Sequence, residues 1–142
     1  MPADAEPWRF LERTPDPCAV VSKGMEVIYL NGQAKSLVQS DWLGKPCWKV
    51  FPVADQNCAA RCPAVKAVRN GGPIAFCEEK ICAVDRSPLD LAVAVIPLPV
   101  AHDQKPGAIL LMRPKPGDEE TQFRSRLMDD ARKLRKSSPL EG

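Results

Sequence analysis

The pattern of apolar and polar residues predicts a helix followed by a hairpin at the start of the chain. Residues 8–11 form a short apolar helical turn that ends at the proline-rich stretch 14–17. Two apolar runs follow, 18–21 and 25–30, and a Ser-Lys-Gly sequence separates them. Because both runs are rich in β-branched residues, they are typical of two antiparallel strands joined by a tight turn.

The middle of the chain predicts several short helices. Apolar residues stand at helical spacing within 33–38, and 47–51 predicts one further helical turn. A firmer helix is expected from Cys62 to the Gly-Gly-Pro sequence at 71–73. Proline follows Cys62 directly, which suits the first position of a helix, where a backbone N–H would have no partner.

Three further apolar segments predict strands, at about 74–82, 89–98 and 106–113. The segment 89–98 places most of its large apolar side chains on one face, with alanines between them. This alternation is typical of an antiparallel sheet that is covered on one side only.

The last predicted element is a helix at 118–137. Its first residues are acidic and its last residues are basic, an order that complements the helix dipole. Its apolar stripe spans barely two heptads, so the helix needs a partner to be stable. We expect an exposed dimer seam formed by Phe123, Leu127, Ala131 and Leu134.

Composition and charge exclude several classes of protein. The chain has 142 residues, of which 44% are hydrophobic, and its net charge is only +2, which indicates one globular domain without a dedicated nucleic-acid surface. No apolar run approaches the roughly 18 residues that span a bilayer. The first ten residues contain neither a basic nor an apolar signal segment, so we expect a cytoplasmic protein.

The order of elements and three short motifs resemble a PAS domain. Residues 14–21 look like that family's entry into its first strand. Residues 28–34 look like its strand-to-helix turn, with Asn31 where the family commonly has asparagine. Residues 43–46 look like the Leu-Gly-Lys turn that follows.

The resemblance implies an α+β fold, with a five-stranded antiparallel sheet, short helices between strands two and three, and a C-terminal signalling helix. It divides the chain into an N-terminal helical cap (1–15), a PAS-like sensor domain (16–114), a coiled-coil-type helix (118–137) and a tail (138–142). It also implies an output domain or a separate regulatory partner. The apolar stripe of the last helix predicts a homodimer, and from the hydropathy and net charge we expect no membrane or direct nucleic-acid contact.

The functional expectation is a sensory or regulatory domain of bacterial signal transduction or transcription regulation. Two alternatives belong to other classes: a constitutive dimerisation or protein-interaction module without a cofactor, and a PAS domain that binds a small ligand. No Ser/His/Asp order, phosphate-binding glycine loop or H-E-x-x-H motif is present, so we expect no enzyme.

A block of cysteines is similar to a subset of PAS domains from bacterial sensor kinases and transcriptional regulators. Cys47, Cys58 and Cys62 lie in this block, and Cys77 or Cys82 on the predicted third strand is a candidate for a fourth sulfur. The subset often has C-x-x-C-P where this chain has C-x-x-x-C-P. Four thiolates suit Zn²⁺ or an iron–sulfur cluster. Three interpretations stay open: structural thiols, a metal or cluster site that senses redox state or metal, and a reversible disulfide.

The remaining candidates are weighed by their surroundings. Cys18 lies in an apolar strand entry and is expected in the core. His102 is the only histidine and lies in a polar turn, so haem ligation is not expected. Four aromatic side chains are candidates to line a ligand pocket, although they would equally fill a core: Tyr29, Trp48, Phe51 and Phe76.

Overall fold

A computed structural model describes residues 3–38, 41–51, 73–82, 88–98, 106–115 and 122–137. Five strands form one antiparallel sheet in the order β2-β1-β5-β4-β3. The strands are β1 (Cys18–Ser22), β2 (Val27–Leu30), β3 (Ala75–Cys82), β4 (Pro88–Pro97) and β5 (Pro106–Pro114). The helices are the 3₁₀ helix η1 (Ala3–Arg13), α1 (Gly32–Lys35), α2 (Cys47–Val50) and α5 (Phe123–Ser137).

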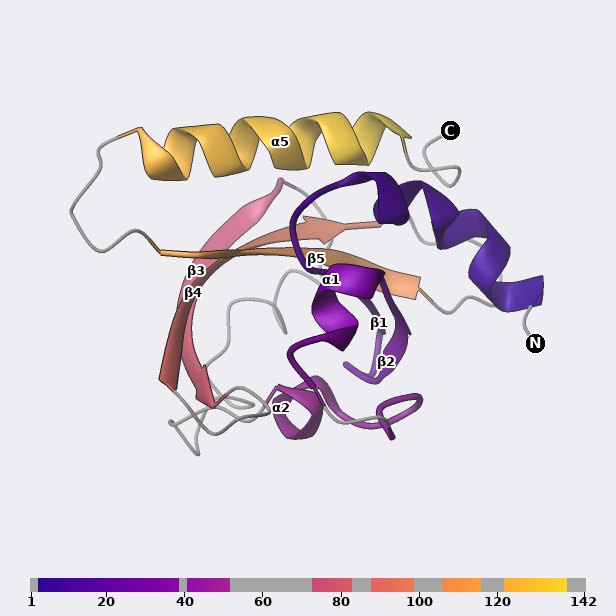
Figure 1. The fold of residues 1–142 in the computed structure, drawn as a ribbon. Helices are drawn as coiled ribbons and strands as arrows, with labels where there is room; N and C mark the ends of the chain where they lie inside the picture. Colours follow the sequence, from indigo (N-terminus) through magenta and orange to yellow (C-terminus); the bar gives the residue numbers. More distant parts are fainter. Residues whose placement is uncertain are drawn as a thin grey trace.

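The predicted α+β architecture is confirmed. Helix α5 lies along one side of the sheet and α2 lies on the opposite side (Figure 1). Each of the last three strands begins and ends within one residue of its predicted bounds. The helix predicted from Cys62 lies outside the described residues, as does His102. Within the described ranges, no helix is long and apolar enough to cross a membrane.

Both faces of the sheet are covered by apolar side chains. We call the two layers the α2-side core and the α5-side core. Buried residues of the α2-side core are Ala19, Val21, Met25, Val27, Leu30, Ala34, Val50, Phe51, Leu91, Val93, Val95, Ala108, Leu110 and Met112. Buried residues of the α5-side core are Trp8, Leu11, Cys18, Val20, Tyr29, Ala92, Ala94, Ile96, Leu98, Ile109, Leu111, Leu127 and Ala131.

Strand β4 shows why the expectation of a sheet covered on one side is wrong. Its side chains alternate between the two cores, and residues 91–96 are all buried. Ala92 and Ala94 face the α5-side core, where α5 packs against β4. Small side chains let a helix approach the strand closely, so these alanines mark a helix-docking face, where the sequence pattern had indicated a solvent-exposed one.

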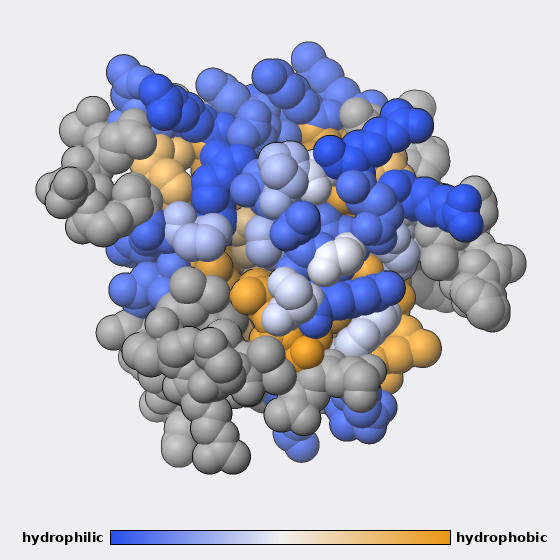
Figure 2. Space-filling view, viewed as in Figure 1, coloured by the Kyte–Doolittle hydropathy of each residue, from blue (hydrophilic) through white to orange (hydrophobic). Residues whose placement is uncertain are grey.

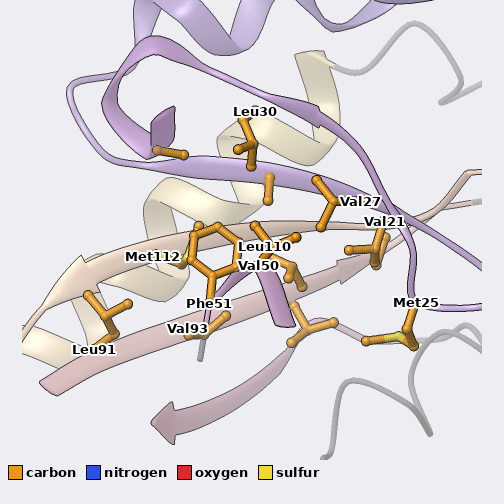
Figure 3. Packing of buried hydrophobic residues seen from close by; sticks show 14 residues of the cluster. Val21, Met25, Val27, Leu30, Val50, Phe51, Leu91, Val93, Leu110 and Met112 are labelled. Atoms are coloured by element: carbon orange, nitrogen blue, oxygen red, sulfur yellow. The ribbon is translucent and has the colours of Figure 1, made fainter. Parts of the chain in front are cut away.

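The second strand of the hairpin begins two residues later than predicted because Met25 belongs to the turn. Met25 has φ 67, a left-handed conformation that usually requires glycine. Its amide donates to the Ser22 carbonyl at 2.9 Å, which closes the turn. The strain costs roughly 1–2 kcal/mol. Burial of a methionine side chain contributes about 1.5–3 kcal/mol, and Met25 is 4% exposed in the α2-side core (Figure 3). Side-chain burial therefore outweighs the backbone strain.

Asn31 joins the N-terminal segment to the first strands and to α1. Its side chain is fully buried. The Oδ1 atom accepts from the amides of Cys18 at 2.9 Å and Ala34 at 3.0 Å. The Nδ2 atom donates to the carbonyls of Leu11 and Asp16, both at 2.9 Å. An asparagine amide can make four such bonds, and all four are made here.

Replacing Asn31 with alanine is expected to destabilise the fold by roughly 3 kcal/mol, because two buried amides and two carbonyls lose their partners. Urea unfolding followed by circular dichroism measures this change. Gln33→Ala, at an exposed position of α1, is the matched control and should change the free energy of unfolding by less than about 0.5 kcal/mol. Equal stability of the two variants would show that the Asn31 hydrogen bonds do not hold the fold.

Candidate functional site

The backbone of β2 positions α2 and its first residue, Cys47. The Gly44 amide donates to the Val27 carbonyl at 2.8 Å, and the Val27 amide donates to the Lys45 carbonyl at 2.9 Å. The Cys47 amide then donates to the carbonyl of Met25 at 2.9 Å. These bonds extend the sheet edge by a short segment, so the start of α2 is fixed against the hairpin turn. A backbone hydrogen bond therefore joins the strained turn residue Met25 directly to the candidate thiol residue Cys47.

Two of the predicted thiols lie against the same core. Cys47 and Cys77 are half-buried and pack against the α2-side core. Cys77 pairs with Val93 in the β3–β4 register, which directs both side chains to that face. Figure 3 shows the side chains of Val50 and Phe51, at the end of α2, lying among those of β4 and β5. Cys58 and Cys62 lie outside the described residues.

The described thiols do not make a metal site by themselves. Over the described ranges, no group of three or more His, Cys, Asp or Glu side chains could hold a metal ion. A structural zinc or an iron–sulfur cluster is commonly held by four protein ligands, and Cys47 and Cys77 supply two. The Zn²⁺ and cluster interpretations therefore depend on Cys58 and Cys62.

Cys18 is confirmed as a core residue. Its side chain is fully buried in the α5-side core, and its Sγ atom lies 3.6 Å from the Asp16 carbonyl, to which it donates. Burial raises the pKa of the thiol well above its ordinary value, and the nearby carboxylates of Asp16 and Glu12 raise it further. A thiol held neutral in this way is a poor nucleophile and a poor ligand.

Iodoacetamide at pH 8.5 is expected to leave Cys18 unmodified in the folded protein while Cys47 and Cys77 react. Peptide mass spectrometry over a time course measures this, and urea-unfolded protein is the control in which Cys18 should react. Modification of Cys18 as fast as Cys47 would contradict its assignment to the core.

The same raised pKa predicts a loss of stability at alkaline pH. In the unfolded chain the Cys18 thiol ionises from about pH 8.5, whereas in the folded chain it stays protonated. The contribution of the protonated Cys18 thiol to the free energy of unfolding is therefore complete below about pH 8.5. It declines as pH rises above that value, by up to about 1.4 kcal/mol per pH unit. Denaturant unfolding between pH 8 and 10 should show a smaller decline in Cys18→Ala.

The four aromatic candidates do not line one pocket. Tyr29 and Phe76 lie on the α5 side of the sheet, whereas Phe51 lies in the α2-side core. The side chain of Trp48 lies outside the described residues. The prediction of a single shared pocket is therefore wrong, because strand alternation directs these side chains to opposite faces.

Tyr29 anchors η1 to the sheet. Its hydroxyl donates to a carboxylate oxygen of Glu12, and the other oxygen of that carboxylate accepts from the Gly32 amide at 2.8 Å. Burial raises the pKa of Tyr29, and the hydrogen bond to Glu12 raises it further, so the hydroxyl remains a donor.

Helix α5 buries its apolar stripe against the chain's own sheet. Leu127 and Ala131 are fully buried in the α5-side core, and Phe123 and Leu134 pack against it. The prediction that these four residues form an exposed seam is therefore wrong: the amphipathic pattern showed that the helix needs a partner but not that the partner is β4. The outer side of the helix is mostly hydrophilic, as the top of Figure 2 shows.

An ion network that the sequence did not predict ties α5 to the sheet. Arg113 of β5 donates to both carboxylate oxygens of Asp16, through Nε at 3.2 Å and Nη2 at 2.6 Å. Nη2 also donates to Asp130 of α5 at 2.6 Å. The hydrogen bonds to Asp16 and Asp130 raise the pKa of Arg113 despite its partial burial, so it stays charged. Asp16 and Arg113 are 97 positions apart, and no local pattern connects them.

Comparison with known proteins supports the fold. No family model and no curated protein matches the amino-acid sequence. A PAS domain from Colwellia psychrerythraea superposes with a TM-score of 0.60 at 16% identity, covering 78% of this chain and 94% of that chain. The PAS domain of nitrogen regulation protein NR(II) from Vibrio parahaemolyticus gives 0.57 at 18% identity, covering 77% and 97%. The chain has the PAS fold.

A third solved structure with this PAS fold belongs to a larger protein. The VqmA dimer of Vibrio cholerae, a LuxR-type receptor described in the absence of its target DNA, gives a TM-score of 0.58 at 12% identity. The match covers 81% of this chain and 52% of that VqmA chain, so this chain spans about half the length of VqmA. VqmA has also been solved bound to DPO.

Proposed function

We propose that this PAS domain is a sensory or regulatory module whose C-terminal helix carries its state to an output domain or a separate regulatory partner. The observation that carries the proposal is the docking of α5 on the sheet through Leu127 and Ala131. A helix of 15 residues is marginal without tertiary contacts. Docked and released forms of α5 can therefore lie close in free energy, and a signal that favours one of them shifts the balance.

The proposed input lies on the opposite face of the sheet. Cys47 and Cys77 are half-buried in the α2-side core, where a change of packing acts on Val93 and its neighbours in β4. The next residues along β4 face α5, so β4 belongs to both cores. We propose redox or metal sensing through Cys47, Cys58 and Cys62, with Cys77 as a further thiol.

The fold and the comparisons favour regulation over catalysis. PAS domains of a two-component sensor histidine kinase and of NR(II) share the fold of this chain. In that context the proposed assembly is a homodimer in the cytoplasm. In the docked form, α5 turns its stripe toward its own sheet, so we place pairing through this stripe in the released form.

A constitutive interaction module is the second candidate. The division of the aromatic candidates between two cores favours it over a ligand-binding PAS domain, because Phe51 and Phe76 cannot contact one ligand from opposite faces. A module of this kind has the same fold but no response of α5 to an input.

Thiol oxidation is expected to change the docking of α5. Hydrogen exchange measured by mass spectrometry compares reduced protein with protein oxidised by diamide, and exchange of the α5 amides should change at least about threefold on oxidation. The Leu127→Asp variant gives the exchange rate of the α5 amides in a released helix, because it places a charge in the α5-side core.

Two variants assign the change to its source. Cys47→Ser should abolish the response to diamide, whereas Cys18→Ala should respond as the unaltered chain does. Identical exchange of α5 before and after oxidation, in protein that also lacks iron, zinc and acid-labile sulfide when purified without oxygen, would refute thiol or metal sensing and favour the constitutive module.

A further inference from the structure

A continuous series of hydrogen bonds joins α1, on the α2 side of the sheet, to α5 on the other side. The Ala34 amide donates to Asn31 Oδ1 at 3.0 Å, and Asn31 Nδ2 donates to the Asp16 carbonyl at 2.9 Å. The carboxylate of Asp16 accepts twice from Arg113, and Arg113 also donates to Asp130 at 2.6 Å. Every step between the two helices is therefore a direct contact.

Asp16 links the two halves of this series because its carbonyl and its carboxylate bind different partners. Its carbonyl is held by Asn31, and its carboxylate is held by Arg113. Asp16 stands between Pro15 and Pro17, and a residue before proline is restricted to extended backbone conformations. A displacement of the carbonyl therefore moves the carboxylate with it, since the backbone has little freedom to absorb the change.

Arg113 makes both of its ion pairs through one nitrogen atom, whose two N–H groups can serve one carboxylate each. The same Nη2 atom donates to Asp16 and to Asp130, both at 2.6 Å. The Asp16 side chain is 15% exposed and forms the two-point contact, whereas the Asp130 side chain is 45% exposed and forms a single contact. Because exposed ion pairs are weak, the contact to Asp130 breaks first when the guanidinium shifts.

We propose that Asn31, Asp16 and Arg113 form a polar relay that couples the position of α1 to the docking of α5 through Asp130. The proposal rests on the proposed function, because it takes the release of α5 as the output. It adds the route: a change that displaces α1 or the Asn31 side chain moves Asp16, reorients Arg113 and weakens its contact with the output helix.

The relay is tested by perturbing its α5 end and measuring its α1 end, because coupling between two sites is reciprocal. Asp130→Asn removes one charge on the surface of α5, and amide exchange in the intact chain is then followed by NMR. The exchange of α5 amides is expected to rise about twofold to fivefold. The exchange of the Ala34 amide should rise about twofold, although Ala34 lies four contacts away.

Asp129→Asn is the matched control. Asp129 is the neighbouring carboxylate on α5, but it pairs with Arg132 of the same helix at 2.6 Å and not with Arg113. This variant makes the same chemical change and should leave the Ala34 amide unaltered. Arg113→Lys keeps the charge but loses the two-point contact with Asp16, so it should reproduce the effect of Asp130→Asn at both ends.

The proposal is overturned if Asp130→Asn leaves α5 exchange unchanged, or if α5 exchange rises while Ala34 behaves as it does in Asp129→Asn. Either result is independent of the thiol experiment, which perturbs the α2-side core and leaves the ion network chemically intact. If oxidation changes the exchange of the α5 amides but Asp130→Asn does not change the exchange of the Ala34 amide, the sensory function stands and the relay is refuted.

Discussion

The position of the N-terminal segment depends on the buried amide of Asn31. A primary amide without water must find all its partners within the protein, and Asn31 finds them in η1, in the entry to β1 and in the first turn of α1. The geometry of four simultaneous hydrogen bonds leaves little freedom in the relative placement of these elements. Once they are placed, the Asp16 carboxylate meets Arg113, and Arg113 meets α5.

The covering of the sheet on both faces is the second constraint. A sheet between two apolar layers cannot move one face independently of the other, because interiors are close-packed and side chains of one strand alternate between the layers. In β4, Val93 faces the α2 side and Ala94 faces the α5 side. This arrangement suits a domain in which an event at the α2 side is converted into a change at a surface helix.

The strands were predictable because their sequence signals are local. Apolar runs bounded by Gly, Pro and polar residues gave four of the five strands to within one residue, and the hairpin turn departed from the pattern where Met25 is left-handed. The long-range contacts were not predictable. The pairing of Asp16 with Arg113 requires the β1–β5 register, and the docking of α5 requires the alanines of β4 to be recognised as a helix site.

The candidate site was predictable in part for the same reason. Residue type identified the thiols, and the structure places Cys47 and Cys77 against one core while it buries Cys18 in the other. Spacing could not show that Tyr29 and Phe76 lie on the opposite face from Phe51, because that division depends on the register of each strand. The amphipathic pattern of α5 likewise shows that one face of the helix is apolar, but it does not show which part of the protein covers that face.

The docking of α5 on its own sheet is the central claim, and isotope-filtered NMR on a mixture of labelled and unlabelled chains tests it most directly. The structure predicts intramolecular nuclear Overhauser effects from the methyl groups of Leu127 and Ala131 to side chains of β4. Effects from these methyl groups only to a second copy of the chain, or to no strand at all, would contradict the docked helix.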